Sequence, residues 1–375
     1  MPLRIEPVRT PKDLHAFVTF PWRLYRDDPL WVPPLIGDTK KLFRPETNPF
    51  FQHGEIQPYL ARRDETIVGR IAAIRNRAHE EFHQEPVGFF GFFECEDDPE
   101  AAMGLLGTVR EFLRTRKLQR FRGPVNPSTN EECGVLVDGF DHPPMVMMTH
   151  SRPYYGPLLE RCGLHKAKDL YAYYLEGDNP PESLEAAVAM VRRRLPDVTL
   201  RRIEIKRLSE EVGVFKTVYN QAWEKNWGFV PMTDAEIDHM ARQLKAVIDP
   251  ALVCIAEKDG RPIAFALGLP DVNVAVRHAN GKLFPLGLLK ILWHARHLKR
   301  MRLLALGVLS EYRRSGIDLL LYHDIFKHGT AKGYRAGEFG WILEDNVAML
   351  KAIDRLGARR YKTYRLYEAS VEPEH

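Results

Sequence analysis

Residues 303–318, LLALGVLSEYRRSGID, contain the stretch that decides the fold. The apolar run Leu303–Leu309 predicts a buried strand, and the polar residues after it predict a short turn before a helix that begins at Gly316. Such a turn directs backbone N–H groups and the positive end of a helix outward, which suits a pyrophosphate. Arg313 and Arg314 can add charge-assisted contacts. An ordinary turn whose arginines face water fits the same residues equally well.

The elements around this stretch follow the same order in both halves of the chain. The C-terminal half is predicted to run strand, helix, strand, helix, strand over residues 303–309, 316–332, 337–342, 347–356 and 360–368. The N-terminal half repeats that order over 87–95, 101–117, 121–125, 154–162 and 172–175. Gly177–Pro181 is rich in turn residues and indicates a linker. We therefore expect an α/β (α+β) protein of two similar domains, 1–178 and 179–375.

Length and composition agree with two folded domains. The chain has 375 residues, of which 45% are hydrophobic and 28% charged, and this length exceeds what one ordinary core serves. No apolar run approaches the roughly 20 residues that span a bilayer, and the first residues lack the apolar core of a secretion signal. The four cysteines are scattered without paired spacing, which indicates a reducing compartment. These features predict a cytoplasmic protein.

Carboxylates near the end of a predicted C-terminal strand are the candidate catalytic groups. Glu338 lies within the strand 337–342, and Glu344 lies in the turn after it, followed by Asp345 and Asn346. A carboxylate at this place can take a proton during a reaction. Asp345 or Asn346 also fits the N-cap of the helix that follows.

A match to a zinc-binding pattern occurs at His79-Glu-Glu-Phe-His83. That pattern needs both histidines on one long helix. Here it lies between two predicted strands, and Pro86 ends it within a few turns. We interpret it as a polar connection and expect no metal.

With these pieces placed, residues 201–368 resemble the GNAT superfamily of acyl-CoA-dependent N-acyltransferases. The superfamily signature Q/R-x-x-G-x-G/A corresponds here to Arg313-Arg-Ser-Gly-Ile-Asp318, and its later asparagine and helix correspond to Asn346 and to the helix ending at Leu356-Gly-Ala358. The resemblance implies a mixed, mostly antiparallel sheet and a site for acyl-CoA as the donor. The residues that it implies for acyl-CoA binding are Leu306, Gly307, Val308, Arg313, Arg314, Ser315, Gly316, Ile317, Asp318 and Asn346.

The resemblance also implies a reaction, the transfer of an acetyl or longer acyl group to a primary amine. Glu338, or in second place Glu344, would take the proton of the amine. Two positions depart from the pattern of the superfamily: Asp318 replaces a small residue, and Ile353 replaces a tyrosine that often serves as general acid. The substitutes for that tyrosine, which the sequence does not rank, are Tyr322, Tyr361 and Tyr364.

The N-terminal half resembles a degenerate second GNAT unit. Its corresponding turn, Glu94–Glu100, is acidic and would repel a pyrophosphate, so acyl-CoA is expected only in the C-terminal half. The whole chain resembles a bacterial family of tandem GNAT proteins with a Tyr-Lys-Thr-Tyr-Arg stretch near the end, here Tyr361–Arg365. Two other functions fit such a chain: an aminoacyl-tRNA-dependent transferase of tandem GNAT fold, and a protein that binds acyl-CoA or another ligand without catalysis.

A basic stretch bears on the acceptor substrate. From Val272 to Ser310 the sequence contains no carboxylate. Within it, residues 283–302 combine an apolar first half with a basic second half, which suits a helix lying in a membrane interface; a buried helix with basic ends fits equally well. The first alternative predicts an amphiphilic amine and contact with anionic membranes, weakened when Lys299, Arg300 and Arg302 become glutamine. A net charge of +4 is too small to indicate a nucleic acid partner.

Overall fold

The computed structural model describes residues 2–224 and 226–372, and the chain forms two compact units. Unit 1 takes residues 1–170, 276–291 and 362–375, and unit 2 takes 171–275 and 292–361. The predicted domains, 1–178 and 179–375, are continuous segments, whereas each unit draws on more than one segment.

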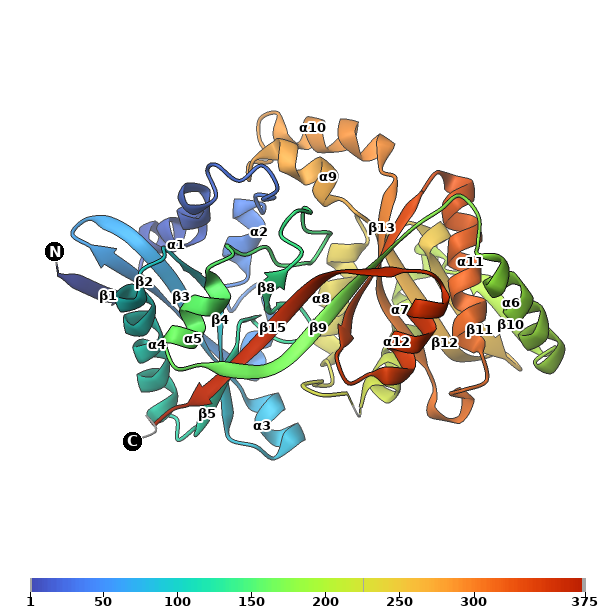
Figure 1. Cartoon of the computed structure of the whole chain (residues 1–375), viewed down its shortest axis with the longest axis horizontal. Coiled ribbons are helices and arrows are strands. Elements are labelled where there is room, and N and C mark those ends of the chain that lie inside the picture. Colours follow the sequence, from blue (N-terminus) through green and yellow to red (C-terminus); the bar gives the residue numbers. More distant parts are fainter. Residues whose placement is uncertain (1, 225, 373–375) are drawn as a thin grey trace. The chain divides into compact units, whose positions relative to one another are not determined.

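The sheet of unit 1 is an antiparallel meander that ends on one parallel pair (Figure 1). Strand β4 pairs in parallel with β5, and β15 is antiparallel to β5 and also to the short β8. The strand order is β1 (Leu3–Pro7), β2 (Gly54–Arg63), β3 (Thr66–Asn76), β4 (Val87–Cys95), β5 (Arg120–Gly123), β15 (Arg359–Ser370), with β8 at Val135–Asp138. A separate hairpin joins β6 (Val125–Asn126) to β7 (Glu132–Cys133).

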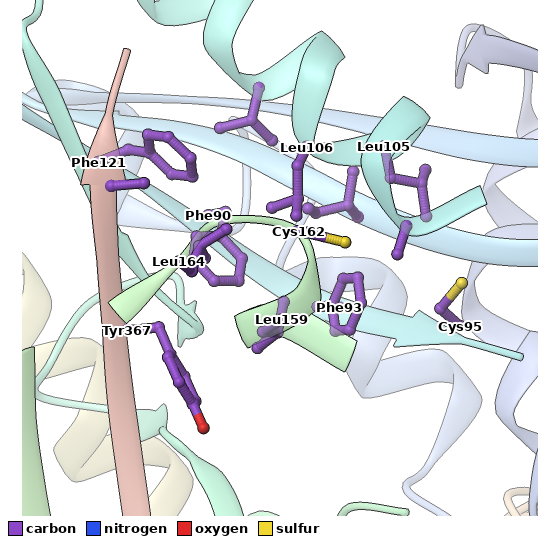
Figure 2. Packing of buried hydrophobic residues seen from close by; sticks show 14 of the residues in the cluster. Phe90, Phe93, Cys95, Leu105, Leu106, Phe121, Leu159, Cys162, Leu164 and Tyr367 are labelled. Carbon is purple, nitrogen blue, oxygen red and sulfur yellow. The ribbon is translucent and has the colours of Figure 1, made fainter. Parts of the chain in front are cut away.

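The helices of unit 1 are α1 (Pro11–Leu24), α2 (Ile36–Lys41), α3 (Arg77–His83), α4 (Pro99–Arg114) and α5 (Tyr155–Arg161). Helix α4 begins as its sequence predicts, because the Asp98 side chain accepts a hydrogen bond of 3.1 Å from the Ala101 amide and Pro99 occupies the first position. Its apolar face, with Leu105 and Leu106, packs into a hydrophobic core of unit 1 (Figure 2). Helix α1 continues through Pro21, although a proline is a local signal against a helix interior.

The sheet of unit 2 repeats the strand plan of unit 1. Strands β10 to β13 pair antiparallel in sequence order, β13 pairs in parallel with β14, and β9 lies next to β14. Their bounds are β10 (Val198–Arg202), β11 (Val253–Lys258), β12 (Arg261–Pro270), β13 (Arg300–Val308), β14 (Ala336–Leu343) and β9 (His165–Glu176). The remaining helices are α6 (Glu182–Arg194), α7 (Leu208–Trp223), α8 (Asp234–Leu244), α9 (Asn273–Val276), α10 (Gly287–His294), α11 (Ile317–Lys332) and α12 (Val347–Arg355).

Each unit takes its last strand from the opposite half of the sequence. In unit 1 this strand is β15, close to the C-terminus, and in unit 2 it is the second part of β9, which precedes the predicted linker. The mixed, mostly antiparallel sheets flanked by helices confirm the predicted fold class. The two closing strands form where the sequence predicts them, but they serve the other unit, because a strand pattern reports burial and not the identity of the neighbouring strand.

Candidate active site

Strands β13 and β14 pair only where they begin. The register joins Arg300–Leu303 to Ala336–Phe339, although β13 continues to Val308 and β14 to Leu343. Among the described residues, no further ladder joins the two strands, so they part in the middle of the sheet. A parted pair leaves backbone N–H and C=O groups along one edge of each strand, and such groups need a partner. The opening is therefore a place where an extended ligand can bind the backbone.

The three strand residues implied for acyl-CoA binding lie at this opening. Leu306, Gly307 and Val308 pair with β12 on one side, and their other side faces the parted strand β14. Gly307 is required by close packing, because a Cβ atom there would lie 2.5 Å from the Trp223 ring of α7. Helix α7 thus holds this part of β13 in place.

The turn after β13 is held in shape from within. Arg314 and Gly316 both have positive φ angles, of 64° and 90°, and the Ser315 hydroxyl donates to the Tyr312 carbonyl over 2.6 Å. The Arg313 guanidinium donates to the Ala222 carbonyl at 2.7 Å, while Arg313 and Arg314 both remain exposed. The turn therefore presents two arginines beside the first residues of α11.

Asp318 departs from the superfamily pattern in the structure as well as in the sequence. Its carboxyl group lies in the first turn of α11, and burial raises its pKa above the usual value although backbone N–H groups of Asp318 and Leu319 act in the opposite direction. A carboxylate here competes with a bound anion for the positive end of the helix. Gly316 is also covered, since a Cβ atom there would lie 2.5 Å from Val191 of α6.

Glu338 lies in a buried polar cluster on the neighbouring strand. Its side chain is 0% exposed, and its Oε1 lies 3.3 Å from Nε of Arg302, which is 1% exposed. The Tyr361 hydroxyl donates to the other carboxylate oxygen. Arg302 also donates to the Gly340 carbonyl at 2.9 Å and lies 5.0 Å from the centre of the Trp341 ring. The carboxylate is thus reached through Tyr361, which is half-buried.

The structure separates the three tyrosines that the sequence leaves unranked. Tyr361 contacts Glu338 and packs against Tyr174 of β9 at 5.3 Å between ring centres. Tyr322 is buried in α11, its hydroxyl donates to the sulfur of Met349, and burial raises its pKa. Tyr364 is buried in unit 1. Among the described residues, Tyr361 is the tyrosine of this set next to a candidate base.

Glu344 and Asn346, the two candidate residues that follow β14, have simpler surroundings than Glu338. Asn346 caps α12, accepting a hydrogen bond of 3.2 Å from the Met349 amide, which is one of the two roles its sequence position allows. Glu344 lies half-buried in the preceding turn. Asn346 thus has a capping role, and Glu344 stays the second candidate base.

Arg302 is the residue that sequence reasoning misplaced. The membrane-interface alternative, one of the two that the sequence left open, places Arg302 at a membrane-facing surface with Lys299 and Arg300, but Arg302 is buried against Glu338, and Arg300 pairs with the buried Asp271 at 2.6 Å. A carboxylate inside a buried strand needs a charged partner. The position of Glu338 in a predicted strand therefore indicates that one nearby basic residue is buried. The expectation for Arg302 was wrong because a run of like charges does not state which member turns inward.

The apolar part of the same stretch is exposed. Phe284 is 77% exposed, Leu289 62% and Trp293 60%. The other exposed apolar side chains of this segment are Leu286, Leu288 and Leu292. Their three- and four-residue spacing places them along one stripe of α10 and the residues before it. The alternative of a buried helix therefore does not apply to α10. Among the described residues, no helix is long and apolar enough to cross a membrane.

The acidic turn of unit 1, Glu94–Glu100, corresponds to the Arg313–Gly316 turn of unit 2, and its carboxylates form ion pairs. Asp98 and Glu100 both contact Arg63, at 2.8 and 2.5 Å, and Asp97 pairs with Arg161 at 2.5 Å. Asp98 already caps α4. The predicted acidic turn is thus neutralised from within its own unit.

The histidine motif of unit 1 forms the short helix α3. His79 is buried, its Nε2 lies 3.0 Å from the Glu85 carboxylate, and burial lowers its pKa to about 4. No group of three or more potential metal-ligating side chains occurs within 2–224 and 226–372.

Comparison with known proteins places the chain among named relatives. The bacterial ceramide synthase of Caulobacter vibrioides is 39% identical over 377 residues, which cover 98% of each chain. Protein YghO of Escherichia coli K12 is 36% identical over 367 residues, 96% of this chain and 93% of its own. No protein-family model matches the chain.

Solved structures confirm the fold. A tandem GNAT protein from the clavulanic acid biosynthesis pathway covers 100% of both chains with a TM-score of 0.59 and 12% identity. An N-acetyltransferase of the same superfamily from Sphaerobacter thermophilus covers 100% of this chain and 97% of its own, with a TM-score of 0.55 and 14% identity. These likenesses concern the fold, and they bear out the predicted resemblance to tandem GNAT proteins.

Proposed function

The chain belongs to the family of tandem GNAT-fold proteins that includes the bacterial ceramide synthase of Caulobacter vibrioides and protein YghO, and from this membership we propose that it is an N-acyltransferase with acyl-CoA as donor and a lipid amine as acceptor. The observation that carries the proposal is the parting of β13 and β14 directly before the turn with Arg313 and Arg314. An open strand edge followed by a cationic turn has the two parts that a pantetheine arm and a pyrophosphate require.

The donor would bind unit 2. The backbone of Leu306–Val308 would pair with the pantetheine amides, and Arg313 and Arg314 would contact the pyrophosphate. Ser315, Gly316, Ile317 and Asn346 would lie beside it at the starts of α11 and α12. Unit 1 lacks this combination, since the carboxylates of its turn are held by Arg63 and Arg161. Acyl-CoA binding to unit 2 alone follows.

The reaction is an aminolysis of the thioester. The neutral amine nitrogen attacks the carbonyl carbon, a C–N bond forms, the C–S bond breaks, and the CoA thiolate takes up a proton. The amine loses one proton, which we assign to Glu338 through the Tyr361 hydroxyl, since that hydroxyl donates to the carboxylate. Holding the two substrates together supplies much of the rate, so a modest base is sufficient. Glu344 is the second candidate for this role.

The acceptor follows from the named relative and from the surface of α10. A ceramide is the amide of a fatty acid and a long-chain amino alcohol, so a protein named for its synthesis points to a primary amine on a long apolar chain. Such an amine resides in membranes. We propose that the exposed stripe 284–293, with Lys290 within it and Lys282, Arg296 and Lys299 on either side, rests on an anionic bilayer and gives a peripheral, cytoplasmic enzyme access to the amine.

Incubation of the purified protein with palmitoyl-CoA and sphinganine tests the function. We expect release of free CoA thiol together with an amide of the combined mass in mass spectrometry. Tight binding of acyl-CoA without product, for amines of several classes, would instead favour a non-catalytic binding protein. Product formed only from an aminoacyl-tRNA would favour the other alternative.

Sedimentation with liposomes at low salt tests the membrane contact. Each basic residue near an anionic surface contributes about 1 kcal/mol, so the triple change Lys290→Gln, Arg296→Gln and Lys299→Gln should weaken binding about a hundredfold. Trp293→Ser should weaken binding to neutral and anionic liposomes alike. Met103→Ser, at an exposed apolar residue of α4, is the matched control and should change neither. Wild-type protein that stays in the supernatant contradicts the contact.

A further inference from the structure

A cavity of about 60 Å³ lies within unit 2, against the first residues of β13 and β14 and the second half of α11. Its walls are mostly apolar. They include Leu184 of α6, Leu303 of β13, Ile325 and Phe326 of α11, Phe339 of β14, and Leu356 after α12. The space is partly open, so an extended group can enter it, and its mostly apolar walls suit an apolar occupant.

The polar groups on its walls are already engaged. The Tyr322 hydroxyl donates to the sulfur of Met349, and the Thr330 hydroxyl donates to the Phe326 carbonyl at 2.9 Å. The Arg335 guanidinium pairs with Asp178 at 2.8 Å. A polar ligand or a chain of water molecules would find few partners here, and apolar cavities of this kind stay dry or take apolar guests. The chemistry of the walls therefore selects a hydrocarbon.

The cavity begins where the opening between the strands ends. Leu303 and Phe339 are the last paired residues of β13 and β14, and both line the cavity. Further along β13 lie Leu306–Val308, where the proposed function places the pantetheine arm. A chain attached to the thioester and directed along the opening towards Leu303 reaches the cavity without crossing the paired part of the sheet.

We propose that this cavity receives the methyl end of the acyl chain of the donor, so that the enzyme selects long acyl groups. The inference rests on the proposed function and adds the class of donor to it. Leu303 and Leu306 are three residues apart on β13, and a strand rises about 3.3 Å per residue, so they lie about 10 Å apart. An extended chain advances about 1.2 Å per bond, so about eight methylene groups cover that distance.

The volume sets the remaining length. A cavity of about 60 Å³ holds roughly four to six water-sized groups, and a methylene group takes up about the same room. Acyl chains of about 12 to 14 carbons therefore fill the space. Within the cavity, each added methylene should raise the affinity about fourfold, whereas acetyl and butyryl groups do not reach it.

Two changes at one wall residue test the cavity in opposite directions. Ile325→Trp fills the space, so kcat/KM with tetradecanoyl-CoA should fall at least tenfold while octanoyl-CoA stays within about twofold. Ile325→Ala enlarges the space and should move the preferred length upward. Leu184→Phe fills the same space from α6 and replaces Ile325→Trp as the test variant if that protein does not fold. Met190→Trp, on the exposed face of α6, is the control and should keep the wild-type profile.

Failure of this inference differs from failure of the proposed function. Amide formation from CoA thioesters with the same chain-length profile in wild type, Ile325→Trp and Leu184→Phe overturns the cavity assignment and leaves the function intact. If no amide forms, calorimetric binding of octanoyl-CoA and tetradecanoyl-CoA provides the same comparison. Equal affinity of the two thioesters for the wild-type protein then overturns the assignment, and a preference for the longer chain that Ile325→Trp abolishes supports it.

Discussion

Glu338→Gln is the sharpest test of the proposed chemistry, because the change keeps the size of the side chain and removes its charge and basicity. If Glu338 takes the proton of the amine, kcat should fall about 10² to 10⁴-fold, the usual contribution of a positioned base. That range corresponds to about 2.7 to 5.4 kcal/mol of transition-state stabilisation. The KM for acyl-CoA should change little, because a base acts in the transition state and Glu338 is not part of the Arg313–Gly316 turn.

The same change also disturbs a buried ion pair, and the assay has to separate the two effects. Arg302 and Glu338 are 1% and 0% exposed, so removing one charge leaves the other buried without its partner, at a cost of about 3–5 kcal/mol. A unit of this size loses roughly 2–4 °C in melting temperature per kcal/mol, which predicts a decrease of about 6–20 °C. Turnover is therefore measured at low temperature, after circular dichroism has shown that the variant is folded.

Two further variants separate catalysis from stability. The double change Arg302→Met with Glu338→Met removes both charges and should recover most of the lost stability without recovering activity. Tyr361→Phe leaves the ion pair in place and removes the hydroxyl that donates to Glu338, so it should lower kcat with a small change in melting temperature. A folded Glu338→Gln protein with more than a tenth of the wild-type kcat would refute the assignment. A larger loss in Glu344→Gln would move the base to that residue.

Two other predictions concern the donor site and the pH dependence of stability. The double change Arg313→Glu with Arg314→Glu should weaken CoA binding at least 30-fold in calorimetry, since each charge-assisted contact contributes about 1.5–3 kcal/mol. Unchanged affinity would contradict the proposed site. Gly316→Glu is a poorer test, because its side chain would also collide with Val191. Burial lowers the pKa of His79 to about 4, whereas a histidine in the unfolded chain has a pKa of about 6.5. Between these pH values the unfolded chain therefore binds more protons than the folded one. The free energy of unfolding of unit 1 should thus decrease by about 2 kcal/mol between pH 7 and pH 5. His79→Gln should remove that loss from the melting temperatures, and an equal loss in both proteins would contradict the reasoning.

The order of the elements could be predicted from the sequence because each is decided locally. The α4 start is an example: Asp98, Pro99 and the apolar spacing that follows are sufficient to begin a helix there, and the structure has it. The residues around Pro21 show the limit of such reasoning. A proline inside a helix removes one hydrogen bond, yet α1 continues past it, with Phe17 and Phe20 on its buried face, so tertiary packing outweighs the local preference.

The candidate site could be predicted only in part. The turn with Arg313, Arg314 and Gly316 and the carboxylates Glu338 and Glu344 stand out in the sequence itself, whereas Leu306–Val308 and Asn346 come from the resemblance to the GNAT superfamily; their roles stay predictions. The pairing of Arg302 with Glu338 depends on the register between two parallel strands far apart in sequence, and a sequence pattern does not contain that register. The exchange of β9 and β15 was missed for the same reason. Alternation and β-branched residues identify a strand, whereas the partner is chosen by the whole sheet.

The contrast between the two units explains how one strand plan serves two purposes. In both units a helix connects the two strands of the parallel pair, α4 between β4 and β5 and α11 between β13 and β14, so both present a helix N-terminus at the same place. In unit 1 that N-terminus is capped by Asp98, and Arg63 and Arg161 lie outside the turn and hold its carboxylates. In unit 2 the arginines lie in the turn itself and are exposed. Because the backbone plan is shared, the placement of charge is the difference on which the proposed assignment of acyl-CoA to unit 2 rests.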